Sequence, residues 1–223
     1  MTTVLDQGYV TLIETWGRDE SIIEAARMST GKGFQGWETD QKLLVYLYNN
    51  KHATPFEMAG MVIEVKAPIF VFREWHRHRT QSYNEMSARY IPLPDENYTP
   101  SIERLMMPGG TNKQAQSTGS PLNNYGATAW QYELEALYKH AQRVYEHGLL
   151  AGVPKELARL AMPVSRYSRM RASANLRNWL SFLTLRMAPN AQWEIRQYAN
   201  AVGALISEHF PRTWKLFEAE QTR

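Results

Sequence analysis

A change of hydrophobic period at Pro68 is the feature that most constrains how this chain can fold. The residues before Pro68 alternate between apolar and polar, with Ile63 and Val65 on one face, as in a β-strand. From Ile69 the apolar residues recur at intervals of three and four, which predicts a helix running to about Arg79. Proline fixes φ and lacks an amide hydrogen, so it separates the two elements.

Periodicity along the rest of the chain predicts a mixture of strands and helices. The further predicted strands are residues 9–16 and 165–174. The predicted helices are residues 19–29, 40–50, 101–106, 126–152, 154–162, 175–187 and 191–210, with a short one from Pro55. We expect an α+β chain that forms a single domain over residues 1–223.

Residues 91–125 interrupt this pattern because they are rich in Pro, Gly, Asn and Ser. Connections of this length are uncommon in compact domains, and many of them act as lids or binding loops. We expect a long flexible loop over residues 91–125, which could act as a flap.

Composition excludes several classes of mechanism. The 223 residues contain no cysteine, which rules out disulfides, thiolate metal sites and a cysteine nucleophile. The formal net charge of +3 gives no general reason for a polyanionic partner. The N-terminus lacks a signal-peptide pattern and no window is long enough to span a membrane, so we expect a cytoplasmic protein without a membrane partner.

The stretch REWHRHRTQSYNEMSARY, residues 73–90, concentrates arginines and histidines. Consecutive residues of a helix point about 100° apart, so Arg77, His78 and Arg79 would fan towards two ligands if they were helical. Arginine forks suit phosphate, and the donors and acceptors that follow suit a nucleobase. Solvated surface charge and favourable interaction with a helix dipole remain the competing structural explanations.

Other candidates lie outside this stretch. In HATPFE, residues 52–57, Thr54 and Glu57 predict a capping box, whereas His52 has no such explanation. The basic candidates on predicted helices with apolar neighbours are Arg159, Arg177 and Arg186, for which surface exposure is the alternative reading. Asn175 precedes a predicted helix, where capping is the ordinary role of asparagine.

Metal and nucleic-acid binding have little support in the sequence. His76 and His78 are two residues apart and would share a face only on a strand, so we expect no metal site. The chain has no recognition-helix, zinc-finger, G-x-G-x-x-G or Walker pattern, and we expect no nucleic-acid partner.

RHRTQSYNEMSARY, residues 77–90, resembles the R-H-R-x-x-S-x-N-E-x-S-x-R-Y signature of flavin-dependent thymidylate synthases, with every fixed position matched. The resemblance continues through HATPFE, VKAPIFV, ARLAMP, NLRNWLSFLTLR and AQWEIRQYA. It implies a central, mostly antiparallel sheet flanked by long helices. It also implies an enzyme that makes dTMP from dUMP by reductive methylation, with 5,10-methylenetetrahydrofolate as carbon donor, FAD as redox cofactor and NADPH as reductant. The family's sites lie between subunits of a homotetramer.

The resemblance also implies roles for individual residues. Arg186 would be catalytic and would polarise the uracil. The implied FAD-binding residues are Thr54, Arg77, His78, Arg79, Glu85, Asn175, Arg177 and Ser181. The implied dUMP-binding residues are His52, Glu74, Arg77, Glu85, Met86, Ser87, Ala88, Arg89, Arg159 and Arg186. Glu74, Ser181 and Asn190 stand where some relatives carry Gln, Asn or His, and Glu74 would need Arg73 or Arg77 to neutralise it beside a phosphate.

Because the chain has no cysteine, it cannot activate uracil with a thiolate, as the flavin-independent synthases do. We therefore expect Arg186 to stabilise negative charge on the pyrimidine and Ser87 to serve in binding. Two other classes of function remain open from sequence. They are a non-enzymatic nucleic-acid-binding protein and a flavoprotein with another substrate.

Overall fold

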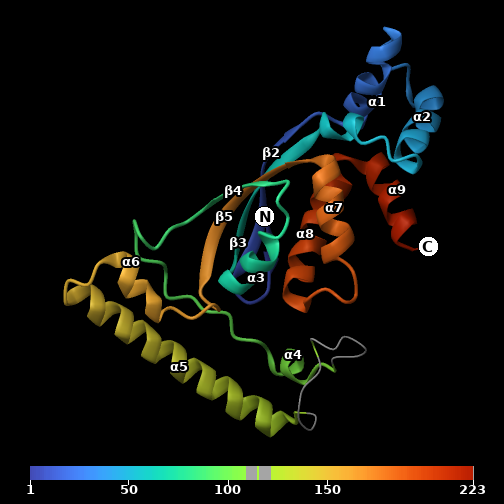
Figure 1. Ribbon diagram of the computed structural model, residues 1–223. Helices are drawn as coiled ribbons and strands as arrows, with labels where there is room; N and C mark the ends of the chain where they lie inside the picture. The colour runs from blue at the N-terminus through green and yellow to red at the C-terminus, as the bar shows by residue number, and fades with distance from the viewer. Residues whose placement is uncertain (109–114, 116–121, 223) are drawn as a thin grey trace.

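A computed structural model of the chain describes residues 1–108, 115 and 122–222. Its centre is a five-stranded sheet with the order β1-β2-β3-β5-β4, in which every neighbouring pair is antiparallel (Figure 1). The strands are β1 (Thr2–Val4), β2 (Gly8–Trp16), β3 (Gly60–Pro68), β4 (Ser82–Glu85) and β5 (Tyr167–Asn175). The expected α+β architecture with an antiparallel sheet is confirmed.

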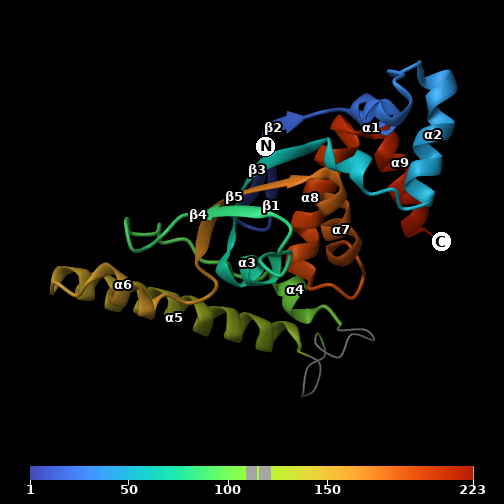
Figure 2. The ribbon, with the colours of Figure 1, turned by 45° about the horizontal axis from the view of Figure 1, so that its top comes forward.

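Helices surround the sheet and extend beyond both of its ends. The α-helices are α1 (Asp19–Arg27), α2 (Trp37–Asn49), α3 (Ile69–Trp75), α4 (Ile102–Met106), α5 (Asn124–Leu150), α6 (Lys155–Ala158), α7 (Leu176–Arg186), α8 (Trp193–His209) and α9 (Pro211–Gln221). Short 3₁₀ helices are η1 (Met28–Thr30), η2 (Thr54–Glu57) and η4 (Arg159–Ala161). Helices α3, α7 and α8 cover the sheet, α1, α2 and α9 gather at one end, and α5 with α6 lies at the other (Figures 1 and 2). Within the described ranges, no helix has the length and apolar character that crossing a bilayer requires.

The core forms between the sheet and the helices that cover it. Met61, Ile63 and Val65 of β3 are fully buried on one face, as the alternation in the sequence requires. The rings of Trp75 from α3 and Phe182 from α7 stack with centroids 4.6 Å apart against this face. The change of period at Pro68 therefore lets a central strand lead directly into a helix that packs on the same core.

Most predicted elements are present. Three elements were not predicted from the sequence, namely strand β1, strand β4 and helix α9. Strand β1 has only three residues, and the sequence of β4, SYNE, is polar because β4 is an edge strand paired only with β5. Helix α9 begins at Pro211, directly after α8 ends, where the sequence indicates a boundary rather than a new helix. Gly152, with φ of 83°, follows the end of α5, a position where the left-handed backbone favours glycine.

Two local predictions were wrong. Helix α3 ends at Trp75, not near Arg79, because the amide of His78 already bonds to the Trp75 carbonyl in a turn. Arg77, His78 and Arg79 therefore do not fan from a helix. The Thr54–Glu57 capping box is absent as well, since η2 has no side-chain cap and Glu57 instead accepts a hydrogen bond from Arg177 at 2.5 Å.

The stretch 91–125 includes residues 109–114 and 116–121, which lie outside the described residues. The described part before them packs onto the body, because Leu93 and Tyr98 are buried and α4 forms at the expected place. The Tyr138 hydroxyl of α5 donates to the Tyr98 carbonyl at 2.9 Å. The flap over residues 91–125 stays a prediction.

Candidate active site

The first group of predicted site residues lines one pocket. Glu85 ends β4, the turn of Met86, Ser87 and Ala88 follows it, and Arg159 begins η4 on the opposite wall. The pocket has a volume of about 420 Å³. The turn is held from outside the pocket because the Met86 amide donates to the Arg169 carbonyl of β5 at 2.8 Å. The neighbouring strand β5 therefore fixes the turn that offers its polar atoms to the pocket.

Two exposed guanidinium groups make this pocket electropositive. Arg159 of η4 and Arg73, on the exposed face of α3, both line it. The Arg73 side chain has no hydrogen bond or ion pair with any other described residue, so it is available to an anion. Among the described residues that line the pocket, Glu85 is the acidic one.

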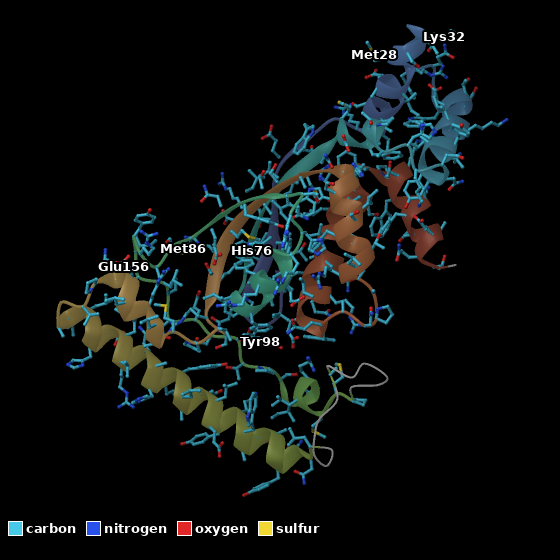
Figure 3. All side chains as sticks on the ribbon, in the orientation of Figure 1. Met28, Lys32, His76, Met86, Tyr98 and Glu156 are labelled. Carbon is cyan, nitrogen blue, oxygen red and sulfur yellow. The ribbon has the colours of Figure 1, made fainter. Side chains whose placement is uncertain are left out.

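Arg89 lies next to the pocket rather than in its wall. Its Nε is 3.8 Å from Glu156, and an adjacent shallow depression is lined by both residues together with Tyr90 and Lys155. The Lys155 ammonium donates to the Tyr90 carbonyl at 2.9 Å. Met86 and Glu156 lie on the same side of the molecule (Figure 3). This part of the predicted nucleotide group is therefore tied to α6.

Arg186, at the end of α7, is held by three acceptors. Its Nε donates to His78 Nε2 at 2.9 Å, its Nη1 to Glu74 Oε2 at 2.9 Å, and its Nη2 to the Glu74 carbonyl at 3.1 Å. The side chain is 16% exposed. Glu74 is thus paired with Arg186 and not with Arg73 or Arg77, which corrects the expectation from sequence.

His78 is neutral in this arrangement because its Nε2 accepts a hydrogen bond from a cation. Burial, reinforced by the charge of Arg186 and opposed by that of Glu74, lowers the pKa of His78 to about 4. The ring packs edge-to-face on Phe182 with centroids 4.9 Å apart. The Tyr83 hydroxyl donates to the His78 carbonyl at 2.7 Å, which fixes the backbone of the turn.

A third group surrounds a second pocket of about 570 Å³ at the α2–α7–α9 end of the molecule. His52, Arg177 and Ser181 line it, and Thr54 lies close to it at the start of η2. Apolar surface from Leu47, Phe56, Leu180 and Phe217 forms much of the remaining wall. Asn175 caps α7, accepting from the Asn178 amide at 3.0 Å, as the sequence predicted.

The predicted site residues therefore form three groups and not one. The pocket beside η4 and the pocket beside α9 share no lining residue. Helices α6 and α9 lie towards opposite ends of the molecule (Figure 1). The exposed side chains of Arg77 and Arg79 make no polar contact with other described residues. A larger pocket of about 650 Å³, between β1 and α8, contains none of the predicted residues.

Sequence reasoning missed some of the supporting residues. Arg73 was considered only as a partner of Glu74, although it sits on the exposed face of the predicted helix four residues before Arg77. Phe182, which packs on the His78 ring, carries no distinguishing signal because aromatic residues in such positions are usually packing residues. From sequence, Tyr83 was a candidate for stacking on a ligand ring, whereas its hydroxyl bonds to the His78 carbonyl. In the described part of the chain, no three His, Asp or Glu side chains are grouped to hold a metal ion.

Comparisons with known proteins show the family to which the chain belongs. Residues 11–212 match the family model described as thymidylate synthase complementing protein. A flavin-dependent thymidylate synthase from Thermus thermophilus is 41% identical over 96% of this chain and 77% of its own. One from Thermosipho melanesiensis is 39% identical over 96% of this chain and 92% of its own.

Solved structures that are similar to this chain include those of a nucleotide methylase. The UMP/dUMP methylase PolB from Streptomyces cacaoi, bound with 5-Br UMP, is 31% identical with a TM-score of 0.85 over 98% of this chain and 96% of its own. PolB bound with 5-Br dUMP is 30% identical with a TM-score of 0.86 over 97% of both chains. The chain is an enzyme that belongs to the flavin-dependent thymidylate synthase family.

Proposed function

We propose that this enzyme converts dUMP to dTMP by reductive methylation, with 5,10-methylenetetrahydrofolate as carbon donor and NADPH as reductant. The observation that carries the proposal is the electropositive pocket formed by residues 85–88, Arg73 and Arg159. Two guanidinium groups suit a nucleotide phosphate, and the side chains of Glu85 and Ser87 provide the acceptors and the donor that suit a pyrimidine. The structures of PolB with brominated UMP and dUMP support a uridylate as the ligand class.

The residues of the second pocket fit a flavin dinucleotide. Arg177 and Lys51 supply cations for a diphosphate, although Glu57 and Glu220 partly compensate them. Apolar walls suit ring systems, and the exposed Arg77 and Arg79 add further donors. We propose that FAD binds through Thr54, Arg77, His78, Arg79, Glu85, Asn175, Arg177 and Ser181, with His52 near the substrate. When bound, FAD supplies the hydride-transfer chemistry that amino-acid side chains lack.

Arg186 is the proposed catalytic residue. A guanidinium can stabilise negative charge that develops on a pyrimidine, which replaces the thiolate that this chain lacks. Neutral His78 and anionic Glu74 hold the guanidinium in one orientation, so less ordering is required when substrate binds. In this proposal Glu74, Arg77, Met86, Ser87, Ala88, Arg89 and Arg159 complete the dUMP site with Glu85.

The separation of the groups supports a homotetramer whose sites are shared between subunits. One chain alone keeps the two pockets apart, and a neighbouring subunit could bring them together. Helix α5 offers a surface for such contacts, because Trp130, Leu137 and Val144 recur at seven-residue intervals and are 45%, 55% and 47% exposed. An apolar stripe at this spacing is typical of a helix that packs against another helix.

Product analysis tests the proposal. Purified enzyme with FAD, NADPH, methylenetetrahydrofolate and dUMP should form dTMP, detected by mass spectrometry, and omission of any one component should stop the reaction. UMP run in parallel tests the second candidate, which the PolB structures favour: methylation of UMP. Methylated UMP without dTMP would replace the proposal with that activity, and no product from either nucleotide would contradict both.

A further inference from the structure

Arg166 is a fully buried cation, and it is not among the residues to which the family resemblance gives a role. It immediately precedes β5, and its side chain has no exposed surface. Burying a guanidinium costs free energy unless acceptors surround it. The acceptors around Arg166 therefore indicate what the residue holds in place.

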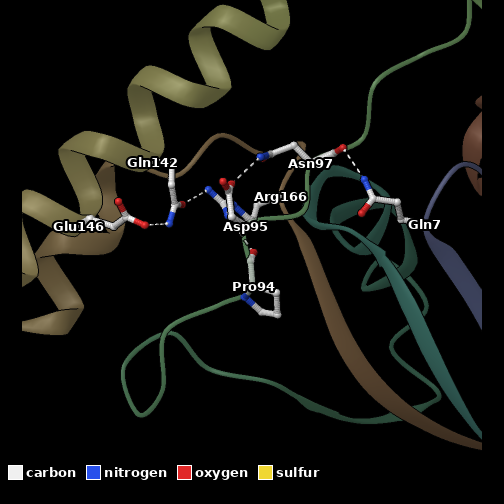
Figure 4. Close-up of polar contacts among 7 residues, drawn as sticks. All are labelled: Gln7, Pro94, Asp95, Asn97, Gln142, Glu146 and Arg166. Atoms are coloured by element: carbon white, nitrogen blue, oxygen red, sulfur yellow. Dashed lines mark hydrogen bonds and ion pairs between the residues drawn. The ribbon is translucent and has the colours of Figure 1, made fainter.

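Three acceptors surround Arg166 and come from two distant segments (Figure 4). Nη1 donates to the Pro94 carbonyl and to Asp95 Oδ1, both at 2.8 Å. Nη2 donates to Gln142 Oε1 at 2.7 Å, and Gln142 in turn donates to Glu146 on α5. One side chain thus joins residues 94–95 to the long helix α5.

The backbone around Arg166 holds the same region together. The Arg166 carbonyl accepts from the Ile69 amide at 2.9 Å, and the Tyr167 amide donates to the Glu96 carbonyl at 2.8 Å. Arg166 also forms an isolated antiparallel bridge with Asn97. The start of α3, the segment after residue 93 and the start of β5 therefore meet at Arg166.

Each of these segments supplies a wall of the proposed nucleotide pocket. Ile69 begins α3, Leu93 directly precedes the Pro94 acceptor, and Val164 lies two residues before Arg166. All three line the pocket, whereas Arg166 itself does not. Arg166 is thus placed to set the separation of these walls without touching a ligand.

We infer that Arg166 is a positioning residue for the nucleotide pocket, acting through Pro94 and Asp95. The inference rests on the proposed function, which supplies dUMP as the ligand. Loss of the guanidinium fork releases residues 93–95 from β5 and α5, and the Leu93 wall loses its fixed position. Binding of dUMP then weakens, while turnover at saturating dUMP changes much less, because Arg166 makes no contact with the reacting atoms.

The test uses the FAD-loaded enzyme and isothermal titration with dUMP, together with KM and kcat. Arg166→Met, which keeps the apolar stem but removes all donors, should raise the Kd and the KM for dUMP roughly tenfold with kcat within about twofold. Arg166→Lys keeps the charge but cannot span three acceptors, so it should recover only part of the affinity. Hydrogen exchange should rise in residues 93–97 of both variants.

Arg104→Met is the matched control. Arg104 also pairs with a buried carboxylate, its Nε lying 2.8 Å from Glu194 Oε1, but it does not line the nucleotide pocket. This control should lower Tm without changing the Kd for dUMP. Should Arg166→Met fail to fold, Asp95→Ala removes one acceptor at a half-exposed position and should weaken dUMP binding in the same direction by a smaller factor.

The outcomes separate the two proposals. If wild-type enzyme does not bind dUMP, the proposed function fails, and the role of Arg166 fails with it. If wild-type enzyme binds dUMP and Arg166→Met, or Asp95→Ala in its place, binds equally well, only the positioning role is overturned. Full recovery of affinity by Arg166→Lys would also overturn it, because charge and not the fork would then be responsible.

Discussion

At the scale of single residues, the orientation of Arg186 is determined before any ligand arrives. Its donors are shared between a neutral imidazole, a carboxylate and a backbone carbonyl. A charged group held in one geometry needs little reorganisation during a reaction, which is the main source of electrostatic catalysis in enzymes. The consequence can be tested by removing the guanidinium.

Arg186→Ala should reduce dTMP formation by about a thousandfold or more, because no other side chain replaces the lost charge. FAD binding, measured by absorbance of the purified protein, should be largely retained. Arg196→Ala serves as the control, since the Arg196 side chain has one hydrogen-bond partner among the described residues, the Pro189 carbonyl. Turnover by Arg186→Ala close to that of the control would refute the catalytic assignment.

His78 gives the protein a defined dependence of stability on pH. Its pKa falls from 6.5 in the unfolded chain to about 4 in the folded protein, so the unfolded state binds more protons between these values. The contribution of neutral His78 is complete above about pH 6.5 and decreases as the pH falls towards 4. Thermal unfolding of wild type and His78→Gln should therefore differ in slope over this window, and identical slopes would exclude the effect.

At the scale of elements, strand β3 needs glycine at its first position. A Cβ on Gly60 would lie 2.3 Å from the Trp16 ring and 2.5 Å from the Ala174 carbonyl, with the backbone of β5 unable to withdraw easily. Gly60→Ala should destabilise folding by about 3 kcal/mol, the upper end for overpacking, as measured by denaturant unfolding. Gly33→Ala is the control, because among the described residues no atom other than those of Gly33 and its chain neighbours lies within 4 Å of its added Cβ. Equal stability of the two variants would contradict this packing.

Elements with an apolar period could be predicted from the sequence, and those without one could not. Alternation in β3 and the helical period of α7 and α8 reflect burial in one core, and the period of α5 reflects burial of one helix face against other segments, so these apolar patterns identify the strands and helices. Strand β4 is polar because it is an edge strand next to the proposed site. Its position at the site determines its residue types more than the usual preference of strands for β-branched and aromatic residues. The end of α3 at Trp75 was missed for a related reason, since the basic residues that follow continue to look helical while forming a turn.

The candidate site was predicted only as a set of residues. The signature in residues 77–90 identified the turn of residues 86–88. Local sequence cannot show that Arg186, which is about 110 residues further along the chain, contacts Glu74 and His78. The partner of Glu74 was predicted wrongly for this reason. Arg166 gave no signal, because a basic residue beside a strand is ordinarily taken to be exposed.

At the scale of the whole molecule, α5 extends along one end of the body (Figure 2). Its apolar stripe of Trp130, Leu137 and Val144 is exposed. The double substitution Leu137→Glu and Val144→Glu should dissociate the proposed homotetramer, because it places charge on a packed helix face. Light scattering after gel filtration should show a smaller species with reduced FAD content. Glu135→Lys, at an exposed position of the same helix but off the face that carries Trp130, Leu137 and Val144, is the charge-change control. An unchanged assembly in the double Glu variant would exclude this face as an interface.

The reaction itself is tested most directly by release of tritium from [5-³H]dUMP. Because methylation at C5 displaces the hydrogen at that position, wild-type enzyme with FAD, NADPH and methylenetetrahydrofolate should release tritium in proportion to dTMP formed, and Arg186→Ala should release none above background. Folded, FAD-loaded wild-type enzyme that binds dUMP and releases no tritium would contradict the account.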